Sequence, residues 1–149
     1  NGALTIGTLD GANIEIREQV GAENIFIFGL QAHEVTSLKA RGYAPETFVA
    51  SNPDLARTLD MIDSGYFSPA NVFDGKPIVG RLLSDGEPFL VLADFAAYAR
   101  AQDEVDALYL QPDEWSRKAV LNALGMGTFS SDRSIREYAE RIWRIKPVL

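Results

Sequence analysis

The stretch that decides the fold is the opening of the chain, Ala3-Leu-Thr-Ile-Gly-Thr-Leu-Asp-Gly-Ala-Asn-Ile-Glu-Ile16. Residues 3–9 form a short apolar run with β-branched members, which is typical of a strand buried on both faces. Gly11 ends the run after Asp10, because glycine accepts a positive φ without steric cost. Asn13 then offers a side-chain oxygen to the free N–H groups of a following helix. The stretch predicts a strand, a glycine turn and a capped helix.

Such a unit directs backbone N–H groups toward an anion in some α/β proteins. Most strand–turn–helix joints are plain connections, however, and a fold does not fix a function. From the residues alone, the turn formed by Asp10, Gly11 and Asn13 is therefore better interpreted as structural than as an anion site.

A second strand follows closely. Residues 14–20 predict a short helix that ends at Gly21, and Asn24-Ile-Phe-Ile-Phe-Gly29 is a compact aromatic and β-branched run closed by glycine. Two strands joined by a helix are expected to lie parallel, so residues 1–30 predict one βαβ unit. A third strand candidate is Phe89-Leu-Val-Leu-Ala93.

The rest of the chain, residues 31–149, predicts a mostly helical continuation of the same domain. In one helix Asn52 is the cap and Pro53 takes the first position, and in another Asp94 is the expected cap. Further helices are expected at residues 34–40, 45–50, 76–84, 112–124 and 131–145. The last carries an apolar stripe at helical spacing, formed by Ile135, Tyr138, Ala139, Ile142 and Trp143.

Composition excludes several classes of function. The formal charge of −7 over 149 residues argues against a nucleic-acid partner. The absence of cysteine excludes disulfides and thiolate chemistry, and a single histidine makes a metal site improbable, so no metal is expected. No apolar run approaches the roughly 20 residues of a membrane helix, so we expect no membrane partner and a cytoplasmic location.

Isolated chemical motifs are weak. His33 has no defined nucleophile beside it, so a surface position is the better interpretation. The run from Ser130 to Ser134 combines hydroxyls with Arg133 at a helix start, and a simple helix cap is favoured over a phosphate site. The glycines Gly7 and Gly11 have the wrong spacing for a nucleotide fingerprint. The residues alone predict no complete active site.

The start of the chain is unusual. It begins at Asn1 without methionine and enters a strand of the buried type almost at once. A parallel strand needs neighbours, so we expect the chain to be the tail of a larger protein.

The opening stretch 1–16 resembles the segment that follows the cofactor lysine in α-1,4-glucan phosphorylases, which act on glycogen, starch or maltodextrin. The run 24–29 is similar to the same family. So is Phe129-Ser-Ser-Asp-Arg-Ser-Ile-Arg-Glu-Tyr-Ala-Glu-Arg-Ile-Trp143, preceded by Pro112-Asp-Glu-Trp115 and Asn122. The resemblance extends from Asn1 to about Trp143 and departs from the family mildly, with Leu9, Gln111 and Ser134 at positions where other residues are common.

This resemblance implies a C-terminal part of a two-domain, Rossmann-like (GT-B type) phosphorylase. It implies an enzyme that transfers a glucosyl unit from an α-1,4-glucan to orthophosphate, with pyridoxal phosphate as cofactor. Asn1 resembles the last residue of the family's cofactor signature, so the Schiff-base lysine is expected four positions before it. No catalytic or cofactor-binding residue is carried onto this chain, and Asp10, Gly11 and Asn13 are expected only to support the cleft.

Three hypotheses remain open at this point. In the first, the chain is a part of a phosphorylase that is inactive alone, and its partners are the remainder of the polypeptide, glucan and phosphate. In the second, it is an autonomous, non-enzymatic interaction module of the same fold. In the third, it is a small phosphate-binding protein that uses the Asp10 turn. A severed sheet exposes apolar surface, so self-association of the chain is also expected.

Overall fold

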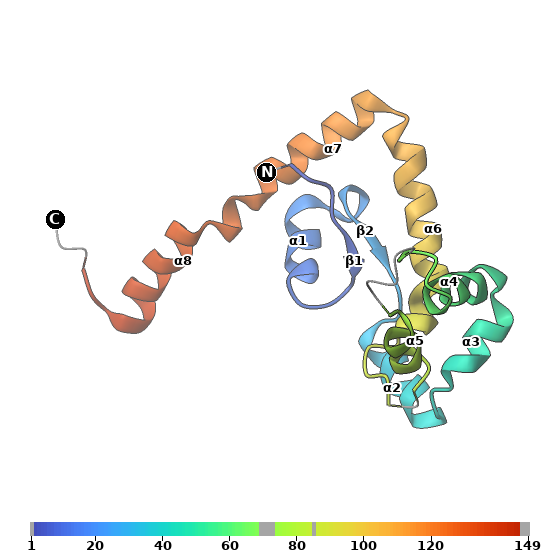
Figure 1. Ribbon diagram of the computed structural model, residues 1–149. Helices are drawn as coiled ribbons and strands as arrows, with labels where there is room; N and C mark the ends of the chain where they lie inside the picture. The colour runs from blue at the N-terminus through green and yellow to red at the C-terminus, as the bar shows by residue number, and fades with distance from the viewer. Residues whose placement is uncertain (1, 69–73, 85, 147–149) are drawn as a thin grey trace. The chain divides into compact units, whose positions relative to one another are not determined.

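A computed structural model of the chain describes residues 2–68, 74–84 and 86–146, so Asn1 lies outside the described residues (Figure 1). Its elements are, in order, β1 (Ile6–Thr8), α1 (Ala12–Val20), the 3-10 turn η1 (Ala22–Asn24), β2 (Phe26–Phe28), α2 (Ala32–Arg41), α3 (Pro45–Ser51), α4 (Pro53–Asp63), α5 (Lys76–Leu82), α6 (Val91–Tyr109), α7 (Pro112–Gly125), the 3-10 turn η2 (Met126–Phe129), α8 (Ser131–Glu137) and the π-helical turn η3 (Tyr138–Trp143).

The predicted βαβ arrangement is confirmed: β1 and β2 pair in a parallel two-stranded sheet, and α1 connects them. Gly11 has φ 47° and Gly21 has φ 88°, as their places at the two ends of α1 require. The predicted cap by Asn13 is wrong, because α1 begins after Gly11 without a side-chain cap. The Asn13 side chain instead lies over Gly7, where a Cβ would collide with it.

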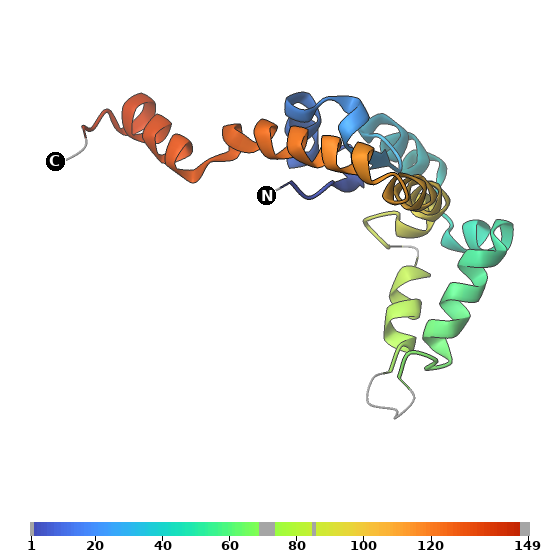
Figure 2. The same ribbon diagram turned by 90° about the horizontal axis from the view of Figure 1, so that it is seen from above.

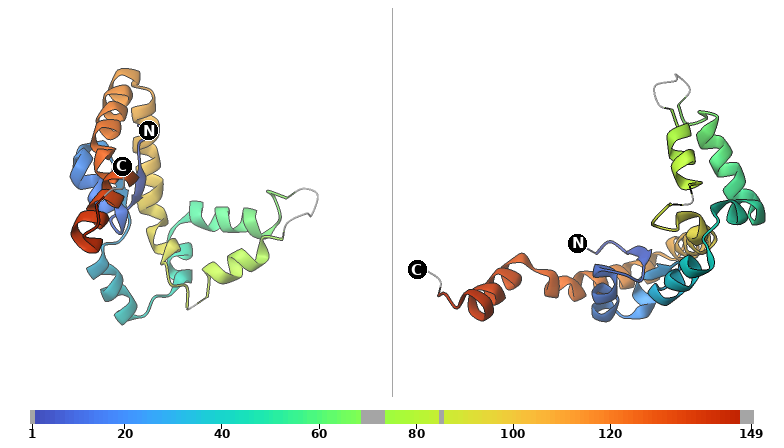
Figure 3. Two further views of the ribbon diagram at one scale, coloured as in Figure 1. Left: turned by 90° about the vertical axis from the view of Figure 1, so that its left-hand side faces the viewer. Right: turned by 90° about the horizontal axis from the view of Figure 1, so that it is seen from below.

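The chain divides into two compact units. The first comprises the chain up to Gly7, residues 11–26, and everything from Glu104 onward. Within it α1 and α7 lie side by side (Figure 3). Lys118 donates to the carbonyl oxygen of Glu23, and the buried Asn122 donates to that of Asn24 at 2.9 Å. These bonds fasten α7 to the η1 turn, about a hundred residues earlier in the sequence.

The second unit comprises residues 8–10 and 27–103. Its core is a helical cluster around Leu55, Leu59, Val79 and Leu92, in which α4 lies beside α5 (Figure 2). Asn52 begins α4 as predicted: its side-chain oxygen accepts from the N–H groups of residues 54 and 55 at 3.1 and 3.0 Å, and a proline follows at the first helical position.

The predicted third strand at residues 89–93 is wrong, as is the predicted cap by Asp94. Leu90 has a left-handed φ of 55°, and helix α6 already begins at Val91. Glu87 provides the reason, because its carboxylate accepts hydrogen bonds from the N–H groups of Phe89 at 2.7 Å and Val91 at 3.0 Å. The side chain therefore starts a helix where the apolar run alone indicates a strand.

The predicted helix over residues 131–145 changes form on the way. Helix α8 ends at Glu137 and continues as the wider turn η3, which stops at Arg144 with φ 53°. Within the described part of this segment, the side chains of Ile135, Tyr138, Ile142 and Trp143 are all at least half exposed. The four side chains are thus exposed as individual residues, while the π-helical turn from Tyr138 changes the α-helical spacing on which the stripe was predicted.

Candidate functional site

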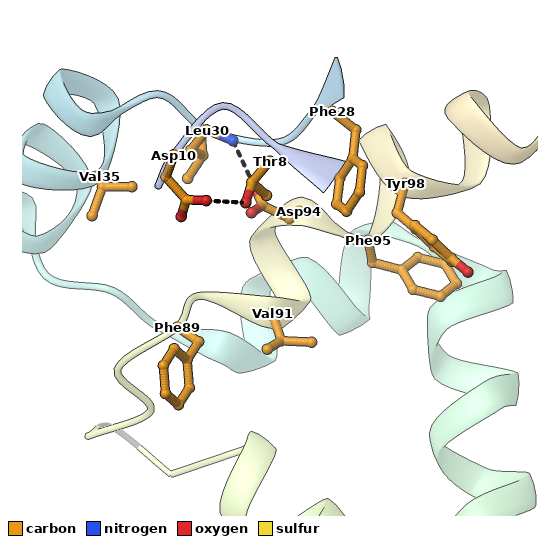
Figure 4. A pocket seen from close by; sticks show the side chains of 10 residues that line it. All are labelled: Thr8, Asp10, Phe28, Leu30, Val35, Phe89, Val91, Asp94, Phe95 and Tyr98. Atoms are coloured by element: carbon orange, nitrogen blue, oxygen red, sulfur yellow. Dashed lines mark hydrogen bonds between the residues drawn. The ribbon is translucent and has the colours of Figure 1, made fainter. Parts of the chain in front are cut away.

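A pocket with a volume of about 520 Å³ lies within the second unit (Figure 4). Its lining residues are Thr8, Asp10, Phe28, Leu30, Val35, Phe89, Val91, Asp94, Phe95 and Tyr98. The volume falls within the range of about 300–1,000 Å³ that is usual for ligand pockets. Aromatic rings form one side, where Phe28 and Tyr98 contact each other edge to face with their centroids 5.3 Å apart.

The Asp10 turn contributes one polar corner of this pocket. The Thr8 hydroxyl donates to Asp10 Oδ1 at 3.0 Å, and the Asp10 N–H donates to the Thr8 carbonyl oxygen at 2.9 Å (Figure 4). The first bond holds the Asp10 carboxylate, and the second holds the backbone of the turn, at the end of β1 where Asp10 lines the pocket.

Asp94 contributes the second carboxylate, from the first turn of α6. Its Oδ1 accepts a hydrogen bond from the Leu30 N–H at 2.8 Å (Figure 4). Gly29, directly after β2, has φ 81°, and a Cβ at that position would lie only 2.7 Å from Asp94 Oδ2. The missing side chain of Gly29 therefore makes room for the carboxylate, which fastens the end of β2 to α6.

Glu87 positions the outer part of the lining. Its side chain is only 5% exposed, and its two bonds fix the turn that carries Phe89 and Val91. Lys39 adds an outer contact, since its Nζ donates to the carbonyl oxygen of Pro88 at 3.0 Å.

The electrostatic character of the pocket is acidic. Burial raises the pKa of Asp94; the Leu30 N–H opposes this shift, and the nearby carboxylates of Glu34 and Glu87 add to it. Burial, followed by the charge of Glu87, also raises the pKa of Tyr43. None of the ten lining residues, all of them in the described part of the chain, is basic. The pocket therefore suits a hydrogen-bond donor or cation with an apolar body, and it repels anions.

The structure separates the three residues predicted to form the cleft turn. Asp10 lines the pocket, whereas Gly11 and Asn13 belong to the other unit and do not line it. A Cβ on Gly11 would meet open space, so only its positive φ requires glycine. The cleft-supporting role of these residues stays a prediction.

His33 lies where the simpler interpretation predicts, whereas the predicted cap at residues 130–134 is borne out only in position, because Ser130 precedes α8 without a side-chain cap hydrogen bond. His33 is exposed on α2. Arg133 donates to the Thr128 carbonyl oxygen at 2.7 Å and to Glu137 at 2.6 Å, so its guanidinium is held by protein groups. Across residues 2–68, 74–84 and 86–146 no three acidic, histidine or cysteine side chains are grouped to hold a metal ion. Among the helices in these ranges, none is both long and apolar enough to cross a membrane.

Sequence reasoning missed the part that Asp94 and Glu87 play in the pocket. Asp94 contacts a backbone group 64 positions away, and the sequence holds no local signal of that pairing. Gly29 was a usable hint, because a glycine directly after a strand often marks the close approach of another group.

The fold and the pocket define an α/β chain with a parallel strand pair and an acidic, aromatic-lined pocket. Comparison with known sequences then identifies the family. The family model described as carbohydrate phosphorylase matches residues 1–145, so the chain belongs to the carbohydrate phosphorylase family.

Similar curated proteins agree with this assignment. The chain is 53% identical over all 149 residues to a glycogen phosphorylase of Synechocystis, of which it covers 17%. It is 48% identical over 145 residues, 97% of its length, to that of Chlamydia pneumoniae, covering 18%. It is 47% identical over 147 residues, 99% of its length, to the human brain form, covering 17%. The chain thus spans about a sixth of the length of these relatives.

Proposed function

We propose that these residues are the C-terminal part of an α-1,4-glucan phosphorylase. The complete enzyme transfers a glucosyl unit from the end of an α-1,4-glucan to orthophosphate and releases glucose 1-phosphate. The 149 residues alone are inactive, and the enzyme works in the cytoplasm. The observation that carries the proposal is the identity of 47–53% to glycogen phosphorylases along nearly the whole chain, each relative being covered only to 17%.

The same observation favours this proposal over an autonomous interaction module. In an autonomous module, the residues that once contacted the rest of an enzyme would no longer be constrained, and their identity to the enzyme would be lost. Instead, identity of about half extends over 97–100% of the chain. A small phosphate-binding protein is disfavoured by charge, because the pocket beside the Asp10 turn carries two carboxylates and no base among its lining residues.

Pyridoxal phosphate belongs to the complete enzyme under this proposal. The pocket residues do not fit it, since Asp10 and Asp94 would repel the cofactor phosphate and no lysine lines the pocket. Under the proposal the Schiff-base lysine lies four positions before Asn1, as the resemblance of the opening stretch to the family's cofactor signature implies. The described residues of this chain therefore contribute support, and we assign no chemical step to them.

The opening turn around Asp10 is proposed to support the cofactor-binding region of the complete enzyme. Asp10 and Thr8 are joined by two hydrogen bonds, and the Asn13 side chain packs on Gly7 within the first unit. These contacts hold the strand that follows the expected lysine. Asp10→Ala in the complete enzyme should lower both cofactor content and turnover, and unchanged values of both would refute this role.

Docking onto the remainder of the polypeptide is proposed for the C-terminal stripe. Ile135, Tyr138, Ile142 and Trp143 are apolar and exposed, and a series of such residues on one helical segment is typical of an interface.

The test is to express the complete open reading frame that contains these residues and to assay it. Phosphate-dependent release of glucose 1-phosphate from a glucan, together with the absorbance of bound pyridoxal phosphate, is the expected result. The 149-residue chain, assayed in parallel, should give neither signal. A complete polypeptide that binds the cofactor but leaves α-1,4-glucans intact would overturn the proposed substrate.

A further inference from the structure

The acidic pocket of the second unit lacks a counter-charge. Asp10 and Asp94 both line it, and Glu34 and Glu87 are close enough to Asp94 to raise its pKa. Lys39 donates to the Pro88 carbonyl oxygen at 3.0 Å rather than to any of these carboxylates. The carboxylates of Glu34 and Glu87 already accept hydrogen bonds from backbone N–H groups, so the two carboxylates that line the pocket, Asp10 and Asp94, are the groups that favour a bound cation.

The rim of the same pocket leaves large apolar side chains in water. Phe89 is 80% exposed, and Val91 and Tyr98 are more than a third exposed, although all three line the pocket. Glu87, whose side chain is buried, holds the backbone of Phe89 in this position by accepting a hydrogen bond from its N–H at 2.7 Å. A buried carboxylate that fixes an exposed aromatic ring is explained if another surface covers the ring.

The length of chain outside these residues indicates what that surface is. The chain covers only 17% of its relatives, and a two-stranded sheet such as β1–β2 is marginal without further strands. We propose that the pocket receives an arginine or lysine side chain, with apolar neighbours, from a part of the phosphorylase polypeptide outside these 149 residues. The inference rests on the proposed function.

The chemistry of the pocket matches such a side chain. The aliphatic stem of arginine or lysine packs on apolar surface while its charged end reaches a polar group. Here Phe28, Phe95 and Tyr98 form the apolar wall, and Asp10 and Asp94 provide the acceptors. A guanidinium or ammonium over an aromatic face gains additional attraction from the ring.

Thiol labelling in the complete polypeptide tests whether the pocket is covered. Phe89→Cys is suitable because the side chain makes little contact within its own unit, and Ser64→Cys, on an exposed position after α4, is the matched control. Peptide-level mass spectrometry follows each site separately. We expect Phe89→Cys to react at least about tenfold more slowly than the same polypeptide in denaturant, because labelling then requires local opening. Reaction at the denatured rate would overturn the proposal.

Removing the negative charge of Asp94 tests whether the side chain that occupies the pocket is a cation. Asp94→Asn keeps the acceptor for the Leu30 N–H but deletes the negative charge, so it should speed labelling of Phe89→Cys roughly tenfold, the equivalent of about 1.4 kcal/mol of docking energy. Asp60→Asn, on the exposed side of α4, is the control and should leave the rate unchanged. Equal rates in both backgrounds would refute a cationic occupant.

A photo-crosslinking residue at position 89 identifies the occupant. The expected product joins this position to a peptide outside residues 1–149 that contains arginine or lysine. A cross-link to any peptide within residues 1–149, from the same chain or a second copy, would overturn the proposal. These measurements do not depend on turnover, so a failure here is distinguishable from the absence of glucose 1-phosphate formation, which would refute the proposed function.

Discussion

Replacement of Asn122 tests how the first unit is fastened together. This side chain is only 2% exposed, and its Nδ2 donates to the carbonyl oxygens of Asn24 at 2.9 Å and Lys118 at 3.0 Å. Asn122→Asp keeps the shape but replaces the donor with a carboxylate that faces two carbonyl oxygens. Asn122→Ala removes the donor and leaves a small cavity.

The expected decrease in the free energy of unfolding follows from the loss of the long-range hydrogen bond to the Asn24 carbonyl oxygen. Depriving a buried acceptor of its donor costs about 1–3 kcal/mol, which is the expectation for Asn122→Ala. An uncompensated buried charge costs more, about 3–5 kcal/mol, which is the expectation for Asn122→Asp at neutral pH. Either loss is a large part of a typical stability of about 5–15 kcal/mol.

The assay is urea unfolding of the chain followed by tryptophan fluorescence. Trp115 and Trp143, the two tryptophans of the sequence, both belong to the first unit and so report on it. Acidification should restore part of the stability of Asn122→Asp, because a protonated carboxyl regains one donor. Ser116→Ala, at an exposed position of α7, is the control, with an expected change within about 0.5 kcal/mol. An Asn122→Asp variant as stable as the parent at neutral pH would refute the reasoning.

Three further predictions concern the second unit and the exposed surface. Leu55→Ala, at a side chain 2% exposed in the helical core, should cost about 2–5 kcal/mol in urea unfolding followed by circular dichroism, whereas Arg57→Ala on the same helix should cost little. Burial raises the pKa of Asp94 in the folded state, so the folded state binds that proton more tightly than the unfolded state does. The free energy of unfolding should therefore fall as pH rises from about 3.9 through the folded pKa. Asp94→Asn should flatten this pH dependence, and an unchanged slope in the variant would contradict the prediction. Finally, the chain should self-associate at micromolar concentration in sedimentation, and Trp143→Glu in the exposed stripe should weaken this; a monomeric parent chain would count against the prediction.

The sequence alone predicts an element correctly where the residues that determine it are close together in the chain. Gly11 and Gly21 mark the ends of α1 because their positive φ values suit glycine, and Asn52 with Pro53 marks the start of α4 through a side chain that bonds two and three residues ahead. The family was also readable from the residues, since its most specific blocks lie near the two ends of the chain.

The tertiary structure decided what depends on partners far apart in the sequence. The apolar run at residues 89–93 reads as a strand until the carboxylate of Glu87 bonds to its N–H groups and starts a helix. Asp94 joins a backbone N–H 64 positions away, and Asn122 joins a carbonyl 98 positions away. Hydrogen-bond partners at such separations are selected by the packing of whole elements, and the pocket, which is built from segments of both ends of the second unit, exists only after that packing is complete.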